Sequence, residues 1–279
     1  MVTRADRVGS RGRPAPRPVA DAARELGLQL LTPARISAPA VVAELLALSP
    51  ECLVVAAYGQ ILPSALIDPP PHGAVNVHAS LLPRWRGASP IAHAILAGDS
   101  ETGVSIMRME AGLDTGPVYS TVRVAIDSSA TTPALTATLA DLGALQLVSV
   151  LAAIEDGTAV ATPQPEEGVT YAPRLTRSDG VVDWAACSAV EVDRMVRALQ
   201  PWPGVLAPID GVDVQVQAGG IADIDPEAAP GAVVLRDGES VVMATRAGGY
   251  RVDLITPAGK RAMTPAAFLR GRHGREANR

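Results

Sequence analysis

Hydrophobic and polar positions change period repeatedly along the first 157 residues, as they do where helices and strands alternate. Apolar positions three and four apart predict helices at 18–27, with Pro18 in the first turn, and at 38–48. Residues 52–57 form an unbroken apolar run, which predicts a parallel strand buried on both faces. Further strands are expected at 28–31, 74–77, 104–109 and 118–124, and further helices at 89–97 and 132–155. This alternation predicts an α/β domain with a mostly parallel sheet.

The pattern changes near residue 156. Residues 156–176 are rich in Pro, Gly and Thr and have no sustained period, which is typical of a linker. After a helix expected at 188–199, short strands are expected at 212–217, 231–235, 240–245 and 250–255. This spacing favours a small antiparallel β-barrel of the OB-fold type. We therefore expect a first domain at 1–157, a linker at 158–178 and a second domain at 179–279.

Composition is that of a folded protein with a sizeable core, since 48% of the 279 residues are apolar. We find no apolar run near the ~20 residues that span a bilayer, and no hydrophobic signal segment at the start. Cys52 and Cys187 stand far apart, which excludes a disulfide framework and a cysteine-rich metal site. We therefore expect a soluble, cytoplasmic protein that does not enter a membrane.

Both ends of the chain are basic, although the net charge is −5. Residues 1–24 contain six Arg, and residues 260–279 contain Lys260 and five Arg, together half of the 24 basic residues. Basic ends on an acidic protein can hold phosphate groups locally, which makes a polyanionic partner possible. Charge alone does not decide between such a site and two solvated tails.

The densest group of polar residues follows the strand expected at 74–77. Alternation places Asn76 and His78 on the same side of the chain, where the ligands of an open parallel sheet bind. An amide beside an imidazole can donate hydrogen bonds to an oxygen that gains negative charge. The structural alternative is that both side chains satisfy backbone groups at the strand end.

A second polar position, Asp114, lies in the tight loop Gly-Leu-Asp-Thr-Gly that follows the strand expected at 104–109. Its carboxylate can orient the His78 imidazole, favour its charged form and accept a proton. A turn Asp more often caps its own backbone. Asp114 therefore belongs to a site with His78 only if the two loops converge.

The segments NVHASLLPRWRGASPI (76–91) and ETGVSIMRMEAGLDTGPVY (101–119) resemble the active-site signature of the 10-formyltetrahydrofolate-dependent formyltransferases. VTYAPRLTRSDGVVDW (169–184), RALQPWPG (197–204) and AGKRAM (258–263) resemble the second domain of those members that act on tRNA. The resemblance covers nearly the whole chain. It implies a Rossmann-like catalytic domain followed by an OB-like, tRNA-binding domain.

The resemblance implies that the formyl group of 10-formyltetrahydrofolate passes to the α-amino group of methionine on initiator methionyl-tRNA. Asn76, His78 and Asp114 stand in the family's catalytic positions. Asn76 and His78 would hold the tetrahedral oxyanion, while Asp114 would keep His78 charged and help to move the proton. No metal is implied, because the folate carries the formyl unit. We expect a monomer whose partners are the folate and the tRNA.

The resemblance also implies two sets of binding residues. The folate pocket, which needs apolar walls and backbone hydrogen bonds, would consist of Val54, Ala56, Tyr58, Ile61, Ser80, Leu81, Leu82 and Pro83. The tRNA would be bound by Arg7, Arg11, Arg13, Lys260 and Arg261, because basic side chains pair with phosphates. The plain alternatives are that Val54 and Ile61 are core residues and that the basic loop is a tail.

Other functions stay open. A sugar-amine or glycinamide-ribonucleotide formyltransferase would share the catalytic signature, and a non-catalytic RNA-binding relative would share the second domain. An NAD-dependent oxidoreductase is disfavoured, because no G-x-G-x-x-G follows a strand.

The resemblance further implies that about 30 residues, one β-α unit and most of the next strand, precede Met1 in the natural protein. Without them a sheet would keep unpaired backbone groups. We therefore expect the 279-residue form to be poorly stable and little active, and an upstream-extended form to be soluble and active.

Overall fold

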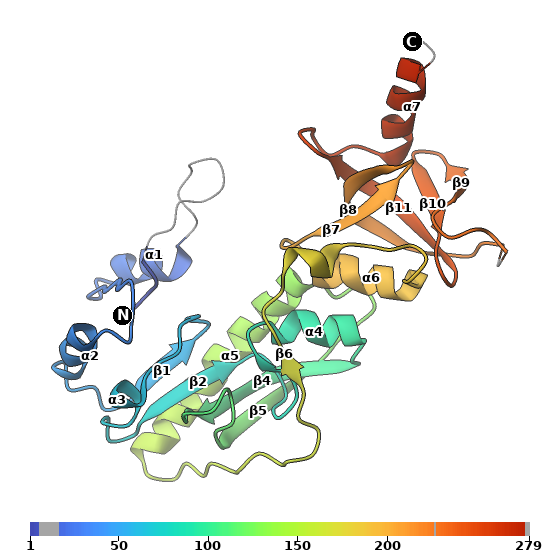
Figure 1. Ribbon diagram of the computed structural model, residues 1–279. Coiled ribbons are helices and arrows are strands. Elements are labelled where there is room, and N and C mark those ends of the chain that lie inside the picture. The colour runs from blue at the N-terminus through green and yellow to red at the C-terminus, as the bar shows by residue number, and fades with distance from the viewer. Residues whose placement is uncertain (6–16, 226, 277–279) are drawn as a thin grey trace. The chain divides into compact units, whose positions relative to one another are not determined.

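The computed structural model describes residues 1–5, 17–225 and 227–276 (Figure 1). They form two compact units, each assembled from separate stretches of the chain. Unit 1 contains Met1–His78, Val104–Val122 and Gly143–Gly168, and unit 2 contains Ala79–Gly103, Arg123–Leu142 and Val169–Arg279. Two strands and the longest helix pass from one unit into the other.

Unit 1 is organised around a sheet with the strand order β1-β2-β4-β5 (Figure 1). The strands are β1 (Leu53–Ala56), β2 (Ala74–His78), β4 (Glu101–Arg108) and β5 (Val118–Ala125). The predicted Rossmann-like α/β class is confirmed, but the sheet is mixed rather than mostly parallel. β1 and β2 are parallel, whereas β2 and β4 are antiparallel. His78, the last residue of β2, pairs with Ser105 of β4. β4 then runs antiparallel to β2, back toward the beginning of that strand.

β1 differs from the expected strand that is buried on both faces. It is the terminal strand of its sheet, and its exposure alternates from residue to residue. Val54 is 46% exposed, because a strand with a neighbour on one side only is incompletely covered. The strand expected at 28–31 is reduced to a single parallel bridge between Val2 and Leu31.

Three short helices belong to unit 1: α1 (Pro18–Glu25), α2 (Pro39–Leu46) and α3 (Ser64–Ile67). The first two confirm the helices predicted from periodicity, and each has a proline in its first turn. Ile36, Leu45 and Leu66 form a buried cluster against which Val2 and Leu31 pack.

Helix α5 (Thr132–Glu155) has the bounds that periodicity predicted, and it runs along the sheet (Figure 1). A Cβ at Gly143 would lie 3.0 Å from Val77 Cγ1, so glycine lets the helix approach β2 closely. By length and composition α5 is long and apolar enough to cross a membrane, so the expectation that no segment reaches that length was wrong. The apolar residues of this segment are interrupted by Thr, Ser, Gln and one Asp, which do not end the helix. Leu145 and Val148 are 71% and 67% exposed.

Unit 2 contains a five-stranded sheet with the order β7-β8-β11-β10-β9, in which every neighbouring pair is antiparallel. The strands are β7 (Val205–Ile209), β8 (Val212–Ala222), β9 (Val233–Asp237), β10 (Ser240–Ala244) and β11 (Gly249–Pro257). This arrangement is consistent with the predicted small barrel. β7 was not predicted, because Pro208 breaks its apolar pattern. β7 is a terminal strand, where a proline without an N–H is tolerated.

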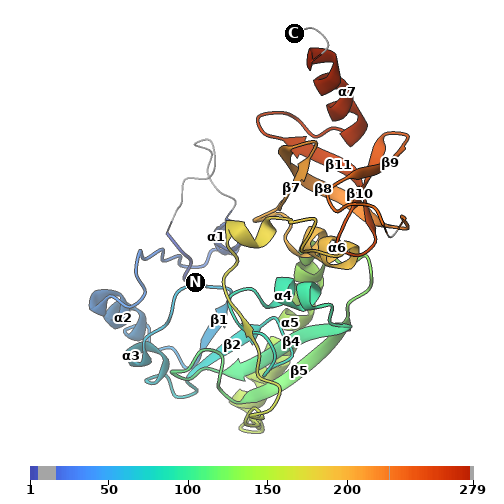
Figure 2. The same cartoon turned by 45° about the vertical axis from the view of Figure 1, so that its right-hand side comes forward.

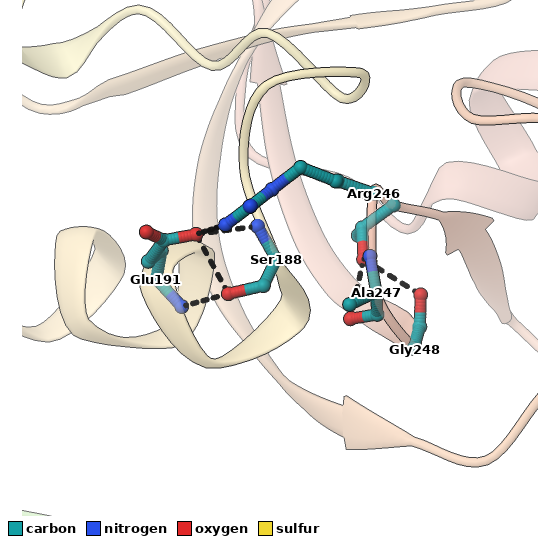
Figure 3. A network of polar contacts seen from close by, with 6 residues as sticks. Ser188, Glu191, Arg246, Ala247 and Gly248 are labelled. Carbon is teal, nitrogen blue, oxygen red and sulfur yellow. Dashed lines mark hydrogen bonds and ion pairs between the residues drawn. The ribbon is translucent and has the colours of Figure 1, made fainter.

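Helix α6 (Ala189–Ala198) packs on β8 and β11 (Figure 2). It begins with a capping box, in which the Glu191 N–H donates to Ser188 Oγ and the Ser188 N–H donates to the Glu191 carboxylate (Figure 3). Arg246 Nη2 lies 3.0 Å from Glu191 Oε2 and ties the loop before β11 to the helix start.

Five further elements belong to the described part of unit 2. α4 (Pro90–Ala97) packs against α6, and the two-residue strands β3 (Arg86–Gly87) and β6 (Tyr171–Ala172) pair in parallel. A 3-10 turn, η2, spans Arg177–Gly180, and α7 spans Pro265–Glu276. The sequence analysis predicted no helix in this last segment, whereas Pro265–Glu276 is helical.

Candidate active site

Asn76 and His78 lie on β2, two residues apart and therefore on the same face. Asn76 pairs with Val55 of β1 on one side and with Met107 of β4 on the other. His78 is the last residue of the strand and is only 5% exposed. The register of the sheet therefore fixes the backbone from which both side chains project.

The Asp114 loop converges with the end of β2. Asp114 Oδ2 lies 3.7 Å from His78 Nδ1, and the Asp114 side chain is 15% exposed. This separation is too long for a hydrogen bond between these two atoms, but it places the carboxylate beside the imidazole. Within the described ranges, no group of three or more His, Cys, Asp or Glu side chains could hold a metal ion.

Backbone conformation gives the Asp114 loop its shape. Asp114 has φ +51°, in the left-handed region that Asp tolerates better than most residues. A Cβ at Gly116 would lie 1.9 Å from the carbonyl oxygen of Arg108, so only glycine fits there. The second glycine of G-L-D-T-G is therefore required by a close backbone approach.

Gln164 holds this loop, and the sequence did not single it out. Its Nε2 donates to the backbone oxygens of Asp114, at 2.8 Å, and Gly116, at 2.7 Å. Gln164 lies in the segment predicted to be a linker. No local motif marks it, because its role depends on a pairing between segments that are far apart in sequence.

The unit 1 residues of the predicted folate set lie on β1 and just after it. Val54 and Ile61 are 46% and 87% exposed, so neither is the core residue of the plain alternative. Ala56 is also exposed. Tyr58 Oη is buried and has no hydrogen-bond partner among the described residues. Burial raises the pKa of Tyr58, and the nearby Arg4 charge lowers it in part.

The other four residues of the folate set, at 80–83, belong to unit 2. Ser80 is buried and donates from Oγ to the backbone oxygen of Arg84 at 2.6 Å. Leu81, Leu82 and Pro83 are half-buried. The Ser80 hydrogen bond ties this segment to Arg84.

Arg84, Trp85 and Asp99 form a group that we call the Asp99 clamp. Asp99 accepts hydrogen bonds from Arg84 Nε (2.8 Å), Arg84 Nη2 (2.5 Å) and Trp85 Nε1 (2.7 Å). Trp85 has φ +62°, which is rare for a bulky residue, and its N–H donates to Thr170 Oγ1 at 2.8 Å. Burial raises the pKa of Asp99, but the hydrogen bonds from Arg84 and Trp85 outweigh burial, so that its pKa is lowered.

Helix α6 reaches the residue next to this clamp. Arg194 Nη1 donates to the backbone oxygen of Ala97 at 3.3 Å, which satisfies a carbonyl at the end of α4. A Cβ at Gly98 would lie 2.1 Å from Arg194 Cζ, so any larger residue there would displace the guanidinium. The Arg194 charge also helps to lower the pKa of Asp99.

The residues predicted to bind tRNA are placed only in part. Arg7, Arg11 and Arg13 lie outside the described residues. Lys260 and Arg261 are exposed in the turn that follows β11.

Two other basic residues near the C-terminus are paired with acids. Arg270 Nη2 lies 3.2 Å from Glu239 Oε1, and Arg272 Nε lies 2.9 Å from Asp210 Oδ2. These ion pairs neutralise part of the basic charge that the sequence suggested for this end of the chain.

Comparison with known proteins defines the class of protein. Residues 1–151 match the formyl transferase family, and residues 174–273 match the formyl transferase C-terminal domain. The two matches together cover most of the chain. The chain belongs to the formyl transferase family.

Particular members of that family are close in sequence. The methionyl-tRNA formyltransferase of Gluconobacter oxydans (strain 621H) is 44% identical over 276 residues, which cover 97% of this chain and 88% of that protein. The protein of the same name from Paramagnetospirillum magneticum (strain ATCC 700264 / AMB-1) is 46% identical over 256 residues, 91% of this chain and 82% of the relative.

Solved structures share the fold at low identity. HypX from Aquifex aeolicus in complex with tetrahydrofolic acid has a TM-score of 0.64 at 19% identity, over 89% of this chain and 43% of that one. WlaRD, a sugar 3N-formyl transferase, has a TM-score of 0.64 at 15% identity, over 87% of this chain and 82% of that one.

Proposed function

We propose that this chain transfers the formyl group of 10-formyltetrahydrofolate to the α-amino group of methionine on initiator methionyl-tRNA. The product is N-formylmethionyl-tRNA, which serves translation initiation. One observation carries the proposal: relatives named methionyl-tRNA formyltransferase are 43–46% identical to it over most of its length. The approach of Asp114 to His78 at the end of β2 supports the same chemistry.

In the proposed reaction the amine nitrogen forms a bond to the formyl carbon, and the bond from that carbon to N10 of the folate breaks. One proton leaves the amine and one reaches N10, so neither an oxidant nor a reductant is needed. Asn76 and His78 donate hydrogen bonds to the oxyanion of the tetrahedral intermediate. Asp114, whose Oδ2 lies 3.7 Å from His78 Nδ1, orients the imidazole and helps to move the proton.

The predicted folate set has members in each unit, and each part supports the proposal by itself. The buried Oη of Tyr58, which has no hydrogen-bond partner in the described part of the chain, is a group that a bound ligand can satisfy. The exposed Val54, Ala56 and Ile61 offer apolar contact surface. Residues 80–83 add the segment that Ser80 ties to Arg84.

Arg7, Arg11, Arg13, Lys260 and Arg261 are the residues proposed to bind tRNA. Guanidinium groups pair with phosphates and stack on unpaired bases, which suits the acceptor end of a tRNA. Lys260 and Arg261 are exposed and can reach a large polyanion. We further propose that the protein acts as a cytoplasmic monomer away from membranes, with domains at 1–157 and 179–279 joined by a linker at 158–178.

A formyl-transfer assay tests the function. The purified chain is incubated with labelled 10-formyltetrahydrofolate and either methionyl initiator tRNA, uncharged tRNA or a nucleotide-linked amino sugar. Label on the methionyl-tRNA alone is the expected result. Transfer to the amino sugar would favour the sugar-amine alternative, and tRNA binding without transfer would favour a non-catalytic relative.

A further inference from the structure

Gln164 makes its two contacts with the Asp114 loop through a single amide nitrogen. The Nε2 group carries two hydrogens and donates to two backbone oxygens, those of Asp114 and Gly116, at 2.8 and 2.7 Å. Both donors of the side chain are therefore used on this one loop. Asp114, one of the two acceptors, is a non-glycine residue with positive φ, a conformation that persists only when its surroundings hold it.

The backbone brings Gln164 to this position. Val118 and Thr162 form an antiparallel bridge, with N–H···O distances of 2.8 and 2.9 Å in the two directions. Antiparallel pairing at these residues places residue 164 opposite residue 116. Gln164 therefore reaches the loop from a segment that lies outside both family matches, which end at 151 and begin at 174.

We propose that Gln164 is a positioning residue for catalysis, which holds the Asp114 carboxylate at its working distance from His78. The inference rests on the proposed function, since it assigns Asp114 a catalytic role. The two carbonyl hydrogen bonds fix the Asp114 backbone, and Asp114 Oδ2 then lies 3.7 Å from His78 Nδ1. Gln164 does not touch the reacting atoms and acts only through Asp114.

The test compares two glutamines of unit 1. Gln164→Met keeps the length of the side chain and removes both donors. Gln146→Met is the matched control, because Gln146 also donates from Nε2, in its case to Ser120 Oγ on β5. We expect Gln164→Met to lower kcat about 10–100-fold with little change in the KM for the folate, since small misplacements of a catalytic group have costs of this order. Gln146→Met should leave both constants near those of the unaltered chain.

A double-mutant cycle separates positioning from a general loss of structure. In an Asp114→Asn background the catalytic carboxylate is already gone, so Gln164→Met should have almost no further effect on kcat. Amide hydrogen exchange gives a second readout that needs no turnover. Exchange at 112–116 should rise in Gln164→Met and stay unchanged in Gln146→Met.

The outcomes are distinguishable. If the unaltered chain transfers no formyl group, the proposed function fails. If it transfers the group and Asp114→Asn is impaired, but Gln164→Met has unaltered kcat and exchange, the role of Gln164 is wrong and the function stands. Fully multiplicative losses in the double variant would also overturn the positioning role. Should Gln164→Met not fold, Gln164→Glu gives the same decision, because its carboxylate offers no donor to the two carbonyl oxygens.

Discussion

At the scale of single residues, the sheet does much of the positioning for the proposed oxyanion site. The backbone of Asn76 is paired on both sides, with Val55 and Met107, so its side chain leaves the strand in a fixed direction. Donors that are already aimed need no reorganisation when charge develops. The amide of Asn76 should therefore matter for the rate more than for ground-state binding of the folate.

Asn76→Ala should lower kcat by about 10²–10³ and leave the KM for the folate nearly unchanged, because one oxyanion donor is lost. His78→Ala should be at least as damaging. His72→Ala is the control, since His72 is exposed and lies ahead of β2. Steady-state kinetics with saturating tRNA would measure both constants. An Asn76→Ala variant with near-normal turnover would refute its role as a donor.

The residues of this site differ in how far the sequence could predict them. Asn76 and His78 follow from the alternation of a strand, which is a local property. The approach of Asp114 to His78 depends on the tertiary structure. From the sequence we could say only that Asp114 belongs to the site if the two loops converge. Gln164 could not be found, because its contacts depend on the pairing of Thr162 with Val118. The catalytic roles of all four stay predictions.

At the scale of elements, the Asp99 clamp shapes the segment that leads from β2 to α4. Asp99 fixes Arg84, and the Arg84 backbone oxygen accepts the hydrogen bond of Ser80 in the proposed folate segment. Asp99→Asn leaves an acceptor for Trp85 but removes the charge that pairs with Arg84. We expect the KM for the folate to rise about tenfold with a smaller change in kcat, as displaced binding groups cost on this scale.

Asp193→Asn is the matched control for Asp99→Asn. Asp193 Oδ2 lies 2.8 Å from Arg197 Nε within α6, in a half-buried pair that does not contact the folate segment. Both variants lose one Arg–Asp pair, so thermal melts should show comparable stability losses. Only Asp99→Asn should weaken folate binding, measured by calorimetry. Equal folate affinities in the two variants would mean that the clamp is purely structural.

The capping box of α6 makes a prediction about pH. Hydrogen bonds from the Ser188 backbone and hydroxyl and from Arg246 lower the pKa of Glu191 from 4.5 to about 2. A lowered pKa in the folded state stabilises the protein above 4.5, and this contribution is lost as the pH falls through about 2. Glu191→Gln keeps the cap geometry but cannot ionise.

The unaltered chain should therefore melt above Glu191→Gln at neutral pH, by no more than about 2–4 °C, because Glu191 is half exposed and solvent screens its charge. The difference should shrink toward zero as the pH approaches 2. Melting curves across this range would measure it. A difference that grows on acidification would contradict the assigned cause.

Element prediction succeeded where one local pattern decides the structure. α5 has its predicted bounds, because the apolar pattern continues past Gly143, and Pro133 stands in the first turn, where a proline is tolerated. β1 was expected to be covered on both faces, but burial depends on neighbours that the sequence does not place. β7 was missed because a terminal strand tolerates the proline that normally argues against a strand.

At the scale of the whole molecule, net charge is a poor guide to where a polyanion binds. The chain carries −5 overall, yet affinity for tRNA depends on the phosphates that local basic groups neutralise. Arg272 shows that a basic residue need not be available, because Asp210 already pairs with it. Arg272 is therefore a suitable control when the contribution of the basic residues at 7, 11, 13, 260 and 261 to tRNA binding is measured.

Binding of tRNA should weaken steeply as salt rises, and replacing Arg11 and Arg13 together with Gln should flatten the logarithmic salt slope by about one unit per lost phosphate contact. The double variant Lys260→Gln/Arg261→Gln should also flatten the salt slope. Arg272→Gln should leave the slope unchanged, because its charge is already neutralised by Asp210. Filter binding of labelled methionyl-tRNA over a salt series would give the slopes. Equal slopes for the Arg11/Arg13 variant and for Arg272→Gln would show that Arg11 and Arg13 do not contact phosphates. A flattened slope for the Arg11/Arg13 variant, with an unchanged KM for the folate, would show that these residues bind the tRNA.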